Sequence, residues 1–372
     1  MKKDWTYKKL GEVCMSDLGK TLNHSTDTGT LYPYLCAINV LWDKIDLSTL
    51  KQTKFEDSEL ERYSVKKGDL LICEGGDTGR AAIWESDEPM LYQNALHRVR
   101  FQPRINARFA LYFLRHLKNI GDIDLKYSKG VTIKHLVKSS LLSISIPIPP
   151  LSIQHSIVAE LDLLHSVISK KKEQLRELDN LAQSLFYQMF GDPITNPMGW
   201  EIKKLGEVAE NCDYMRKPIT ASERIPGNIP YYGASGIVDY VRDYIFDGDY
   251  LLVSEDGANL LARSTPIAFS ISGKNWVNNH AHVLKFQESS TQLYVQTLIN
   301  LIDISDIVTG AVQPKLNQAQ LNKFPLPLPP LSLQQSFAAK VSAIEAQKQA
   351  ITQSIQHTEA LLAQRMDNYF GI

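Results

Sequence analysis

One segment has residue types that could bind a nucleotide. Leu18-Gly19-Lys20-Thr21 ends like a phosphate-binding loop, whose backbone amides and lysine hold phosphate groups. That loop needs a first glycine five positions before Gly19, and Cys14 stands there. The turn that cradles the anion is therefore missing, and we predict no nucleotide site.

A second group of residues could bind a metal or exchange protons. His280 and His282 are close in sequence, but no clear third ligand accompanies them at a suitable spacing, so the pair is predicted not to ligate a metal. Glu255-Asp256 could be an acid pair, although aspartate beside glycine more often forms a turn. We predict no catalytic residue, no metal and no cofactor.

The composition indicates the class of protein to which these segments belong. The chain of 372 residues is 44% hydrophobic and 22% charged, which is typical of a folded, soluble protein of more than one domain. No run approaches the roughly 20 apolar residues of a membrane span, and the charged start lacks the apolar core of a signal peptide. We expect a cytoplasmic protein without membrane contact. The four cysteines have no zinc-like spacing and are expected to be reduced thiols: Cys14, Cys36, Cys73 and Cys212.

Charge is distributed unevenly along the chain, although the net charge is only −1. Between residues 98 and 138 only Asp122 and Asp124 oppose a run of positive side chains. The run consists of Arg98, Arg100, Arg104, Arg108, Arg115, Lys118, Lys126, Lys129, Lys134 and Lys138. It could be a solvated face or a local positive field, which the net charge would not reveal.

The chain repeats itself. Five motifs occur twice in the same order, at an offset of 180 to 197 residues, so one unit is written twice. The pairs begin at Trp5 and Trp200, Pro33 and Pro230, Gly68 and Gly248, Ile146 and Leu326, and Phe190 and Phe370.

Each unit begins with a mixed α/β part, which we call a head. In the first head, β-rich runs at 70–73, 81–84 and 97–101 alternate with a helical segment near 106–117. The prolines of 147–150 are predicted to close the head, because consecutive prolines continue neither a helix nor a sheet.

Each unit ends in a long amphipathic helix of about 40 residues, roughly 60 Å in length. Apolar residues recur every seven positions over about four heptads, as in a coiled-coil seam. The first seam is Ile157, Leu161, Leu164, Ile168, Lys171, Leu175, Leu178, Ala182, Leu185 and Met189. The second is weaker: Phe337, Val341, Ile344, Lys348, Ile351, Ile355, Thr358, Leu362, Arg365 and Tyr369. We predict that the two helices pair, with Lys171 and Lys348 at the seam edge or reaching solvent. The alternative is that each helix packs on its own head.

The predicted fold class is therefore α+β (mixed): two α/β heads separated by a long antiparallel two-helix coiled coil, with a pseudo-two-fold internal repeat. Such symmetry suits DNA, because readers with two-fold symmetry place equivalent elements in successive grooves.

At this point the sequence resembles a known family over its whole length: the specificity subunits of type I restriction-modification systems. The Trp-x-x-Lys-Lys-Leu-Gly-Glu-Val start of each unit, and Gly68-Asp69-Leu70-Leu71-Ile72 with its repeat, look like parts of a target-recognition domain. The Pro-Pro-Leu-x-x-Gln entry to each helix is similar to the family's spacer regions. The resemblance implies a target-recognition domain at 1–150, a spacer helix at 151–192, a second target-recognition domain at 193–330 and a second spacer helix at 331–372.

The resemblance also implies a function and partners. The chain would bind a bipartite sequence in double-stranded DNA and hold two adenine methyltransferase subunits, and restriction (translocase) subunits would join them. The chain has no Asn-Pro-Pro-Tyr or Asp-Pro-Pro-Tyr string, so methyl transfer by the chain itself is not expected. Two alternatives stay open: a single-chain restriction-modification enzyme or nuclease, and a coiled-coil adaptor whose heads bind proteins.

Candidate DNA contacts come from comparing the two heads. Residues 130–135 parallel 310–315 and place a basic residue similarly, so Lys134 and Lys315 are the first candidates. The alternative is that both lysines lie in solvent at strand ends. Weaker candidates are Arg98, Lys129, Asn278 and His280. The first head has about 17 extra residues around 41–62, where we expect the two heads to differ.

Overall fold

A computed structural model describes residues 5–23, 27–130, 134–310 and 312–371. The chain forms two compact units, and each unit holds one head together with segments of both long helices. The first unit is Met1–Lys171 with Ser354–Ile372, and the second is Lys172–Gln353. Across the described residues, no helix is both long enough and apolar enough to cross a membrane.

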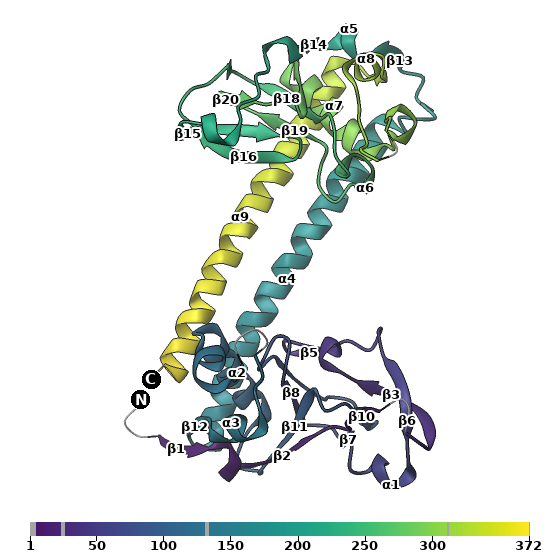
Figure 1. The fold of residues 1–372 in the computed structure, drawn as a ribbon. Coiled ribbons are helices and arrows are strands. Elements are labelled where there is room, and N and C mark those ends of the chain that lie inside the picture. The colour runs from purple at the N-terminus through teal and green to yellow at the C-terminus, as the bar shows by residue number, and fades with distance from the viewer. Residues whose placement is uncertain (1–4, 24–26, 131–133, 311, 372) are drawn as a thin grey trace. The chain divides into compact units, whose positions relative to one another are not determined.

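The first head contains two four-stranded sheets (Figure 1). We call the sheet with the strand order β2-β11-β8-β9 the inner sheet, and the sheet with the order β6-β3-β10-β7 the outer sheet. The strands of the inner sheet are β2 (Cys14–Leu18), β11 (Leu96–Phe101), β8 (Leu70–Cys73) and β9 (Ala81–Ile83). Those of the outer sheet are β6 (Lys51–Phe55), β3 (Thr30–Leu35), β10 (Met90–Tyr92) and β7 (Ser64–Val65). The remaining elements are β1 (Thr6–Lys9), β12 (Ser145–Ile148), α1 (Asp57–Leu60), α2 (Ala107–Asn119) and α3 (Lys138–Ser143).

The second head repeats this topology strand for strand. Its inner sheet is β14-β21-β18-β19 and its outer sheet is β16-β15-β20-β17. The inner strands are β14 (Glu210–Asn211), β21 (Ala281–Lys285), β18 (Tyr250–Ser254) and β19 (Ala268–Ile271). The outer strands are β16 (Gly236–Val241), β15 (Pro226–Gly233), β20 (Lys274–Val277) and β17 (Phe246–Asp247). Beside them are β13 (Glu201–Lys204), β22 (Pro325–Leu328), α5 (Leu205–Val208), α6 (Asn259–Ala262), α7 (Ser289–Leu301) and α8 (Gln318–Asn322). The duplication inferred from the sequence is thus a duplication of fold.

The strands predicted in the first head correspond to the inner sheet. The runs 70–73, 81–84 and 97–101 are β8, β9 and β11, and the helical segment is α2, whose first amides are capped by Asn106. The prediction for the prolines of 147–150 was partly wrong. Pro147 lies inside β12 and faces Tyr7 of β1 in an antiparallel pair. A two-stranded pair tolerates proline because each strand has an open edge on which no amide is needed.

The extra residues of the first head lie between β3 and β6. There the chain runs through residues 36–50 and forms a small hairpin, β4 (Val40–Leu41) with β5 (Lys44–Ile45), whereas the equivalent strands β15 and β16 are joined directly by residues 234–235. The side chain of the fully buried Asn39 holds the insertion together. Its Oδ1 accepts a hydrogen bond from the Cys36 backbone amide (2.9 Å), and its Nδ2 donates to the Asp46 backbone carbonyl (3.0 Å). The insertion is therefore an ordered part of the head.

Helices α4 (Leu151–Phe190) and α9 (Leu331–Phe370) are each 40 residues long, as predicted. Within the first unit, Glu160 pairs with Arg365 (2.9 Å), and Lys171 donates to Thr358 (3.4 Å). Within the second unit, Lys348 pairs with Asp179 (2.7 Å), and the Phe190 and Phe337 rings are 5.1 Å apart. In these pairs the residue number on α4 rises as the residue number on α9 falls, so the paired segments are antiparallel within each unit.

The predicted seams are the buried faces of these helices. Every position of the first seam is buried or half-buried, and so is every position of the second except Arg365. Arg365 is 45% exposed because it turns outward to Glu160, and the neighbouring Met366 is buried in its place. The ammonium of Lys171 contacts the hydroxyls of Ser354 and Thr358, and the side chain of Lys348 is 26% exposed beside Asp179. Both seam lysines therefore keep polar partners, which avoids the cost of an unpaired buried charge.

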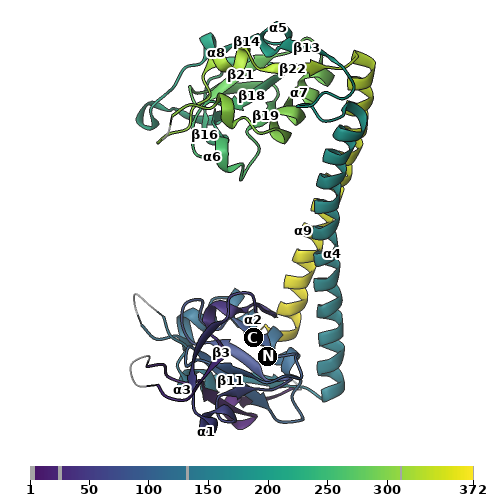
Figure 2. The same ribbon diagram turned by 90° about the vertical axis from the view of Figure 1, so that its right-hand side faces the viewer.

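Aromatic side chains fasten the helices to the heads. In the first unit the C-terminal end of α9 lies beside α2 (Figure 2). There Phe370 packs on Phe109 and Phe113 of α2, with ring centroids 5.3 and 5.8 Å apart. In the second unit Phe190, at the end of α4, packs on Tyr294 of α7 at 4.8 Å. The repeated Phe-Gly motif is thus the point where each helix ends against a head.

Candidate nucleic-acid interface

Two buried histidines occupy the same place in the two heads. His97 of β11 and His282 of β21 are fully buried, and each points Nε2 at a backbone oxygen of the segment that follows the sheet. His97 reaches the Leu136 oxygen (2.7 Å) and His282 the Leu316 oxygen (2.8 Å). Because a carbonyl only accepts, Nε2 carries the proton in both rings. Each histidine holds the segment from which the candidate lysine projects.

The two histidines differ in the residue that lies beside Nδ1. Asp213, in the 3-10 turn that follows β14, places Oδ2 2.5 Å from Nδ1 of His282. In the first head the strand partner of His97 is Leu18, and Nδ1 of His97 has no hydrogen-bond partner among the described residues. Burial lowers the pKa of His97 below its ordinary value of 6.5, with Lys138 adding to the effect. The first head therefore leaves one ring nitrogen of its histidine without a partner, whereas the second head gives both ring nitrogens an acceptor.

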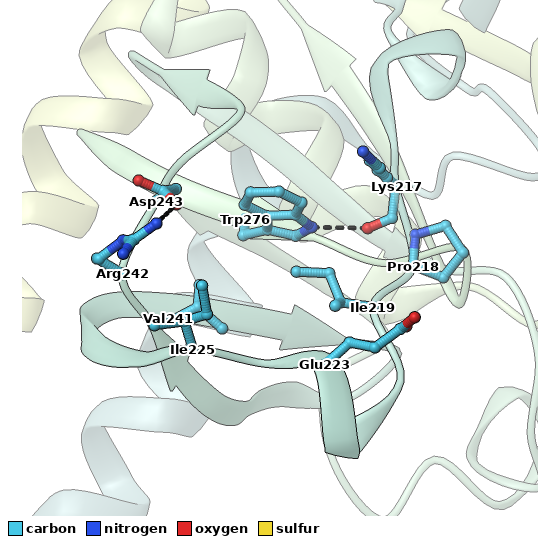
Figure 3. Close-up of a pocket in the computed structure, with 9 residues that line it drawn as sticks. All are labelled: Lys217, Pro218, Ile219, Glu223, Ile225, Val241, Arg242, Asp243 and Trp276. Atoms are coloured by element: carbon cyan, nitrogen blue, oxygen red, sulfur yellow. Dashed lines mark hydrogen bonds and ion pairs between the residues drawn. The ribbon is translucent and has the colours of Figure 1, made fainter.

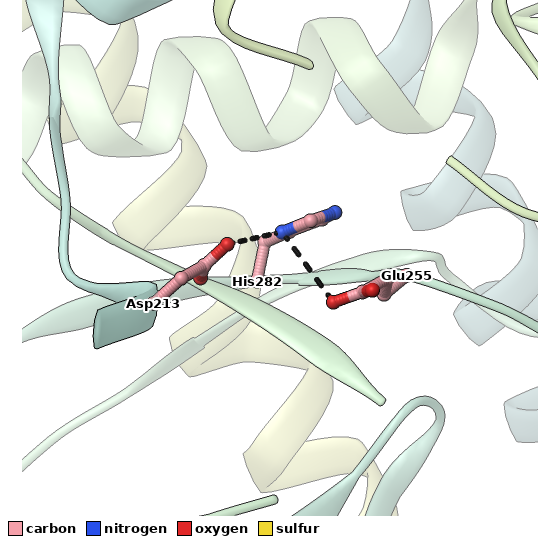
Figure 4. Close-up of side chains that lie close together, drawn as sticks. All are labelled: Asp213, Glu255 and His282. Carbon is pink, nitrogen blue, oxygen red and sulfur yellow. Dashed lines mark hydrogen bonds and ion pairs between the residues drawn. The ribbon is translucent and has the colours of Figure 1, made fainter. Parts of the chain in front are cut away.

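Around His282 the second head has a cluster of acids and bases (Figure 4). One oxygen each of Asp213 and Glu255 and a ring nitrogen of His282 lie within 4.8 Å of one another, which is the spacing of metal ligands. Protein cations already fill this space: Arg216 Nη1 donates to Glu255 (2.6 Å), and Lys315 Nζ lies 3.1 Å from the other Glu255 oxygen. A divalent ion would add charge beside two cations, so the donor set does not fit a metal.

The same contacts set the charge of the two acids. Burial acts to raise the pKa of Asp213, but the hydrogen bond and charge of His282, the Val283 amide and Arg216 outweigh it, and the pKa is lowered. Burial also acts to raise the pKa of Glu255, and Arg216, His282 and Lys315 likewise lower it overall. Both carboxylates are ionised near neutral pH and hold the cations in place.

Three of the predicted residues meet at this edge of the second head. The Lys315 backbone forms isolated bridges with Thr309 and Asp256. His280 Nδ1 lies 2.8 Å from Asp256 Oδ2, and the His280 amide donates to the side chain of Asn278 (2.8 Å). Lys315 and His280 are about half exposed, at 52% and 47%, whereas Asn278 is buried and shapes the turn.

The predicted residues of the first head do not form one group. Lys129 is exposed, and its backbone pairs with that of His135, which is the structural equivalent of the Thr309–Lys315 pair. Lys134 donates to the Asp124 carbonyl (2.9 Å). The equivalent of Lys315 is therefore His135 rather than Lys134. The rest of the predicted parallel, residues 131–133 and 311, lies outside the described residues.

Arg98 is held apart from this edge by its own partners. Its guanidinium donates to the Ser64 carbonyl (2.6 Å) and to Asp17 (3.1 Å), and its side chain is only 13% exposed. In this structure Arg98 ties β11 to the outer sheet.

The predicted basic run is largely neutralised by carboxylates from other parts of the chain. Six of its ten cations form ion pairs: Arg98, Arg100, Arg108, Lys118, Lys126 and Lys138. Their partners include Asp17, Asp43, Asp69 and Asp77, which lie outside residues 98–138 and which counting charges within the run could not include. The positive field inferred from the run is therefore much weaker in the fold.

Lys20, from the segment that ends like a phosphate-binding loop, is a structural residue. It is buried, and its ammonium donates to Glu59 (2.6 Å) and to the Lys54 carbonyl (2.9 Å). Its ammonium group therefore joins α1 to β6 of the outer sheet.

A separate recess of about 310 Å³ lies in the outer part of the second head (Figure 3). Its lining includes Trp276, whose indole nitrogen donates to the Lys217 carbonyl (2.6 Å), and the pair formed by Arg242 and Asp243 (3.3 Å). None of the predicted residues lines it, and its charged groups are not arranged as a nucleophile with a base.

Sequence reasoning missed Asp213 and Arg216 and read Glu255 only as part of a turn. His282 and Asp213 are 69 positions apart and meet only because β14 and β21 are neighbours. The sequence offered one signal: these charged residues are flanked by residue types that are usually buried. A charged side chain is rarely buried without a partner.

Comparison with known proteins adds three findings. The family model of the type I restriction modification DNA specificity domain matches twice, over residues 2–180 and 197–359. A putative type I restriction enzyme specificity subunit from Haemophilus influenzae is 37% identical over 146 residues, which are 39% of this chain and 37% of that protein. The putative MjaX and the MjaIX specificity subunits of Methanocaldococcus jannaschii are 20% and 22% identical, and each match covers 92% of this chain and 87% of the relative.

Solved structures share the fold. The type I restriction-modification S subunit from M. genitalium superimposes with a TM-score of 0.56 at 15% identity, covering 99% of this chain and 96% of that one. A chain from a study of complex assembly and conformational transition in a type I R-M system gives 0.64 at 18% identity, covering 98% and 97%.

Proposed function

The chain belongs to the type I restriction modification DNA specificity family, and from that premise we propose that it reads a bipartite DNA target for a methyltransferase and restriction complex. It is a recognition subunit rather than an enzyme, and the chemistry is that of its partners. One observation carries the proposal: both the family match and the strand order occur twice. Two heads of one fold with different surfaces suit a target made of two different half-sites.

The partners follow from the same duplication. Each unit combines a head with paired segments of α4 and α9, so a surface that binds one adenine methyltransferase subunit is available twice. Restriction (translocase) subunits join through that assembly. We place the complex in the cytoplasm, together with its double-stranded DNA target.

The proposed DNA-facing edge of the second head is centred on Lys315 and His280. Both are half-exposed cationic or titratable side chains held by buried acids, which gives them fixed positions. Asn278 supports His280 from below. In the first head Lys129 and Lys134 are the corresponding basic candidates, and Arg98 is the weakest because its guanidinium is already used. Phosphate contacts of this kind position a protein, and base contacts specify the sequence.

Mapping adenine methylation tests the proposal directly. Cells that express this chain with the methyltransferase subunit of its own system are expected to methylate one split sequence with a fixed gap. The purified chain with methyl donor and DNA, without that subunit, is expected to transfer nothing. Methyl transfer by the lone chain would support the single-chain enzyme. If binding by the assembled complex were insensitive to salt and sequence, the heads would bind proteins instead.

A further inference from the structure

A short hairpin at residues 309–315 projects two unsupported side chains from the second head. Val312 is 99% exposed, and its neighbour Gln313 is also exposed. Among the described residues, the Gln313 side chain has no hydrogen-bond partner. A single exposed valine does not by itself indicate a binding site. Val312 differs from other exposed valines because hydrogen bonds and ion pairs hold the segment that carries it.

The base of the hairpin is rigidly built. The backbones of Thr309 and Lys315 exchange both hydrogen bonds (2.8 and 2.7 Å), and the Gly257 amide donates to the Pro314 carbonyl (3.1 Å). Gly310 has a φ of +91°, and a Cβ there would lie 2.3 Å from the Gln313 carbonyl oxygen. The backbone at this position therefore requires glycine.

The charges beneath the hairpin are fixed as well. Glu255 holds Lys315 on one side and Arg216 on the other, and the Glu255 carbonyl accepts from the Leu316 amide (2.8 Å). His282 holds the Leu316 carbonyl from below. A cation at the base and an amide with an apolar side chain at the tip are what a groove-reading element needs: the cation for a phosphate, the tip for base edges.

We propose that hairpin 309–315 is a base-reading element of the second head, in which Gln313 recognises an adenine edge and Val312 contacts a thymine methyl group. In the major groove glutamine pairs in bidentate fashion with adenine, and apolar side chains contact the methyl group of thymine. The inference rests on the proposed function and adds the residues that set sequence in one half-site.

The first head has the same pair of backbone hydrogen bonds with a different sequence between the paired residues. Lys129 and His135 exchange both backbone hydrogen bonds (2.8 and 2.8 Å), at positions 180 residues before Thr309 and Lys315. The sequence after Gly130 is Val131-Thr132-Ile133, and that after Gly310 is Ala311-Val312-Gln313. A shared backbone pair with two different intervening sequences is what two different half-sites require.

Gln313→Ala and Val312→Ser test the proposal in the assembled methyltransferase complex. Both side chains are exposed, so neither change removes a buried contact. The matched control is Gln287→Ala, an exposed glutamine beyond the opposite end of β21 from His280. Methylation is mapped across a genome, and binding is measured on duplexes that differ by one base pair.

Gln313→Ala is expected to lose roughly ten- to hundred-fold discrimination at one A·T position of one half-site. Val312→Ser is expected to lose discrimination at a thymine of that same half-site, and Gln287→Ala to behave as wild type. Lys315→Ala is expected to weaken binding to all sequences alike and to lower the salt slope by about one.

The proposal is overturned if both tip variants discriminate at every position as the wild-type complex does. Discrimination lost in both half-sites, or in neither while all affinity falls, would also overturn it, because a tip in one head reads only one half-site. These results would leave the proposed function intact, since the wild-type complex would still methylate its split sequence. A wild-type complex that methylated no defined sequence would instead contradict the proposed function.

Discussion

The equivalent buried histidines have different neighbours in the two heads: Leu18 lies opposite His97 in the sheet, whereas Asp213, from the turn after β14, contacts His282. Opposite Leu18, the Nδ1 of His97 faces no acceptor among the described residues, so a second proton on the ring would be a buried charge without a partner. Beside Asp213, both nitrogens of His282 lie within hydrogen-bond distance of an oxygen atom.

The first head is therefore expected to lose stability on mild acidification. The pKa of His97 is lowered when folded, so the unfolded chain binds the extra proton more readily. The stabilising effect is complete above pH 6.5, the ordinary pKa, and is lost as pH falls from there toward the folded value, by at most about 1.4 kcal/mol per pH unit. Hydrogen exchange of β8 and β11 between pH 7 and 5, corrected for intrinsic rates, measures the loss.

His97→Gln is the informative variant for this prediction. A glutamine amide still donates to the Leu136 carbonyl but does not titrate, so the protection of β8 and β11 should become flatter with pH. His155→Gln, at an exposed position of α4, should keep the wild-type profile. Identical profiles for wild type and His97→Gln would show that His97 is not the titrating group.

At the scale of elements, the start of each long helix is fixed by a buried glutamine. Gln154 accepts from the Asn106 amide (2.8 Å) and donates to the carbonyls of Arg104 (3.0 Å) and Pro149 (2.9 Å). Gln334 donates likewise to Pro329 (2.7 Å) and accepts from Thr291 (2.6 Å). The repeated Pro-Pro-Leu-x-x-Gln motif thus joins a helix to its head.

Gln154→Ala is expected to destabilise the first unit by about 1–3 kcal/mol, because it leaves the buried Pro149 carbonyl and the partly buried Asn106 amide and Arg104 carbonyl without these partners. Urea unfolding of the full chain measures the change. Gln174→Ala, at an exposed position of the same helix, should fall within about 0.5 kcal/mol of wild type. An equal effect of the two substitutions would mean that the contacts of Gln154 contribute no net stability.

The sequence predicted those elements whose signal is local. The seams of α4 and α9, the runs of the inner sheet and the duplication all follow from spacing within one stretch of chain. The outer sheet was not predicted, because strands such as β10 have only three residues and are defined by distant partners, as in the parallel pairing of Leu91 with Tyr34. The same limit applied to the site: Lys315 and His280 were identified by type, but Glu255 and Arg216, which hold the edge together, were not.

At the scale of the whole molecule, most of the clustered cations form ion pairs within the fold. The near-zero net charge reflects these pairs and does not exclude DNA binding by the few cations that remain exposed. Arg108, for example, bridges Asp43 of the insertion and Asp162 of α4 (2.8 and 2.5 Å). Under the proposed function, sequence recognition would depend on a few placed side chains and much of the affinity would come from the assembled complex. The two units would then offer methyltransferase subunits two equivalent surfaces.

The two helices expose leucines at equivalent positions, Leu181 of α4 (51%) in the second unit and Leu361 of α9 (40%) in the first. Exposed apolar side chains on otherwise polar helix faces fit a partner surface.

Native mass spectrometry of the wild-type chain at saturating methyltransferase subunit should show two copies bound. Leu181→Glu and Leu361→Glu should each leave one copy, and the double variant none, because a glutamate would be buried without a partner in each interface. Both positions are exposed in the chain itself, so the substitutions should leave its fold unchanged. A single copy bound to the wild-type chain at saturation would contradict the two-site arrangement. Two copies retained by the double variant would show that the subunits bind elsewhere on the repeated surface.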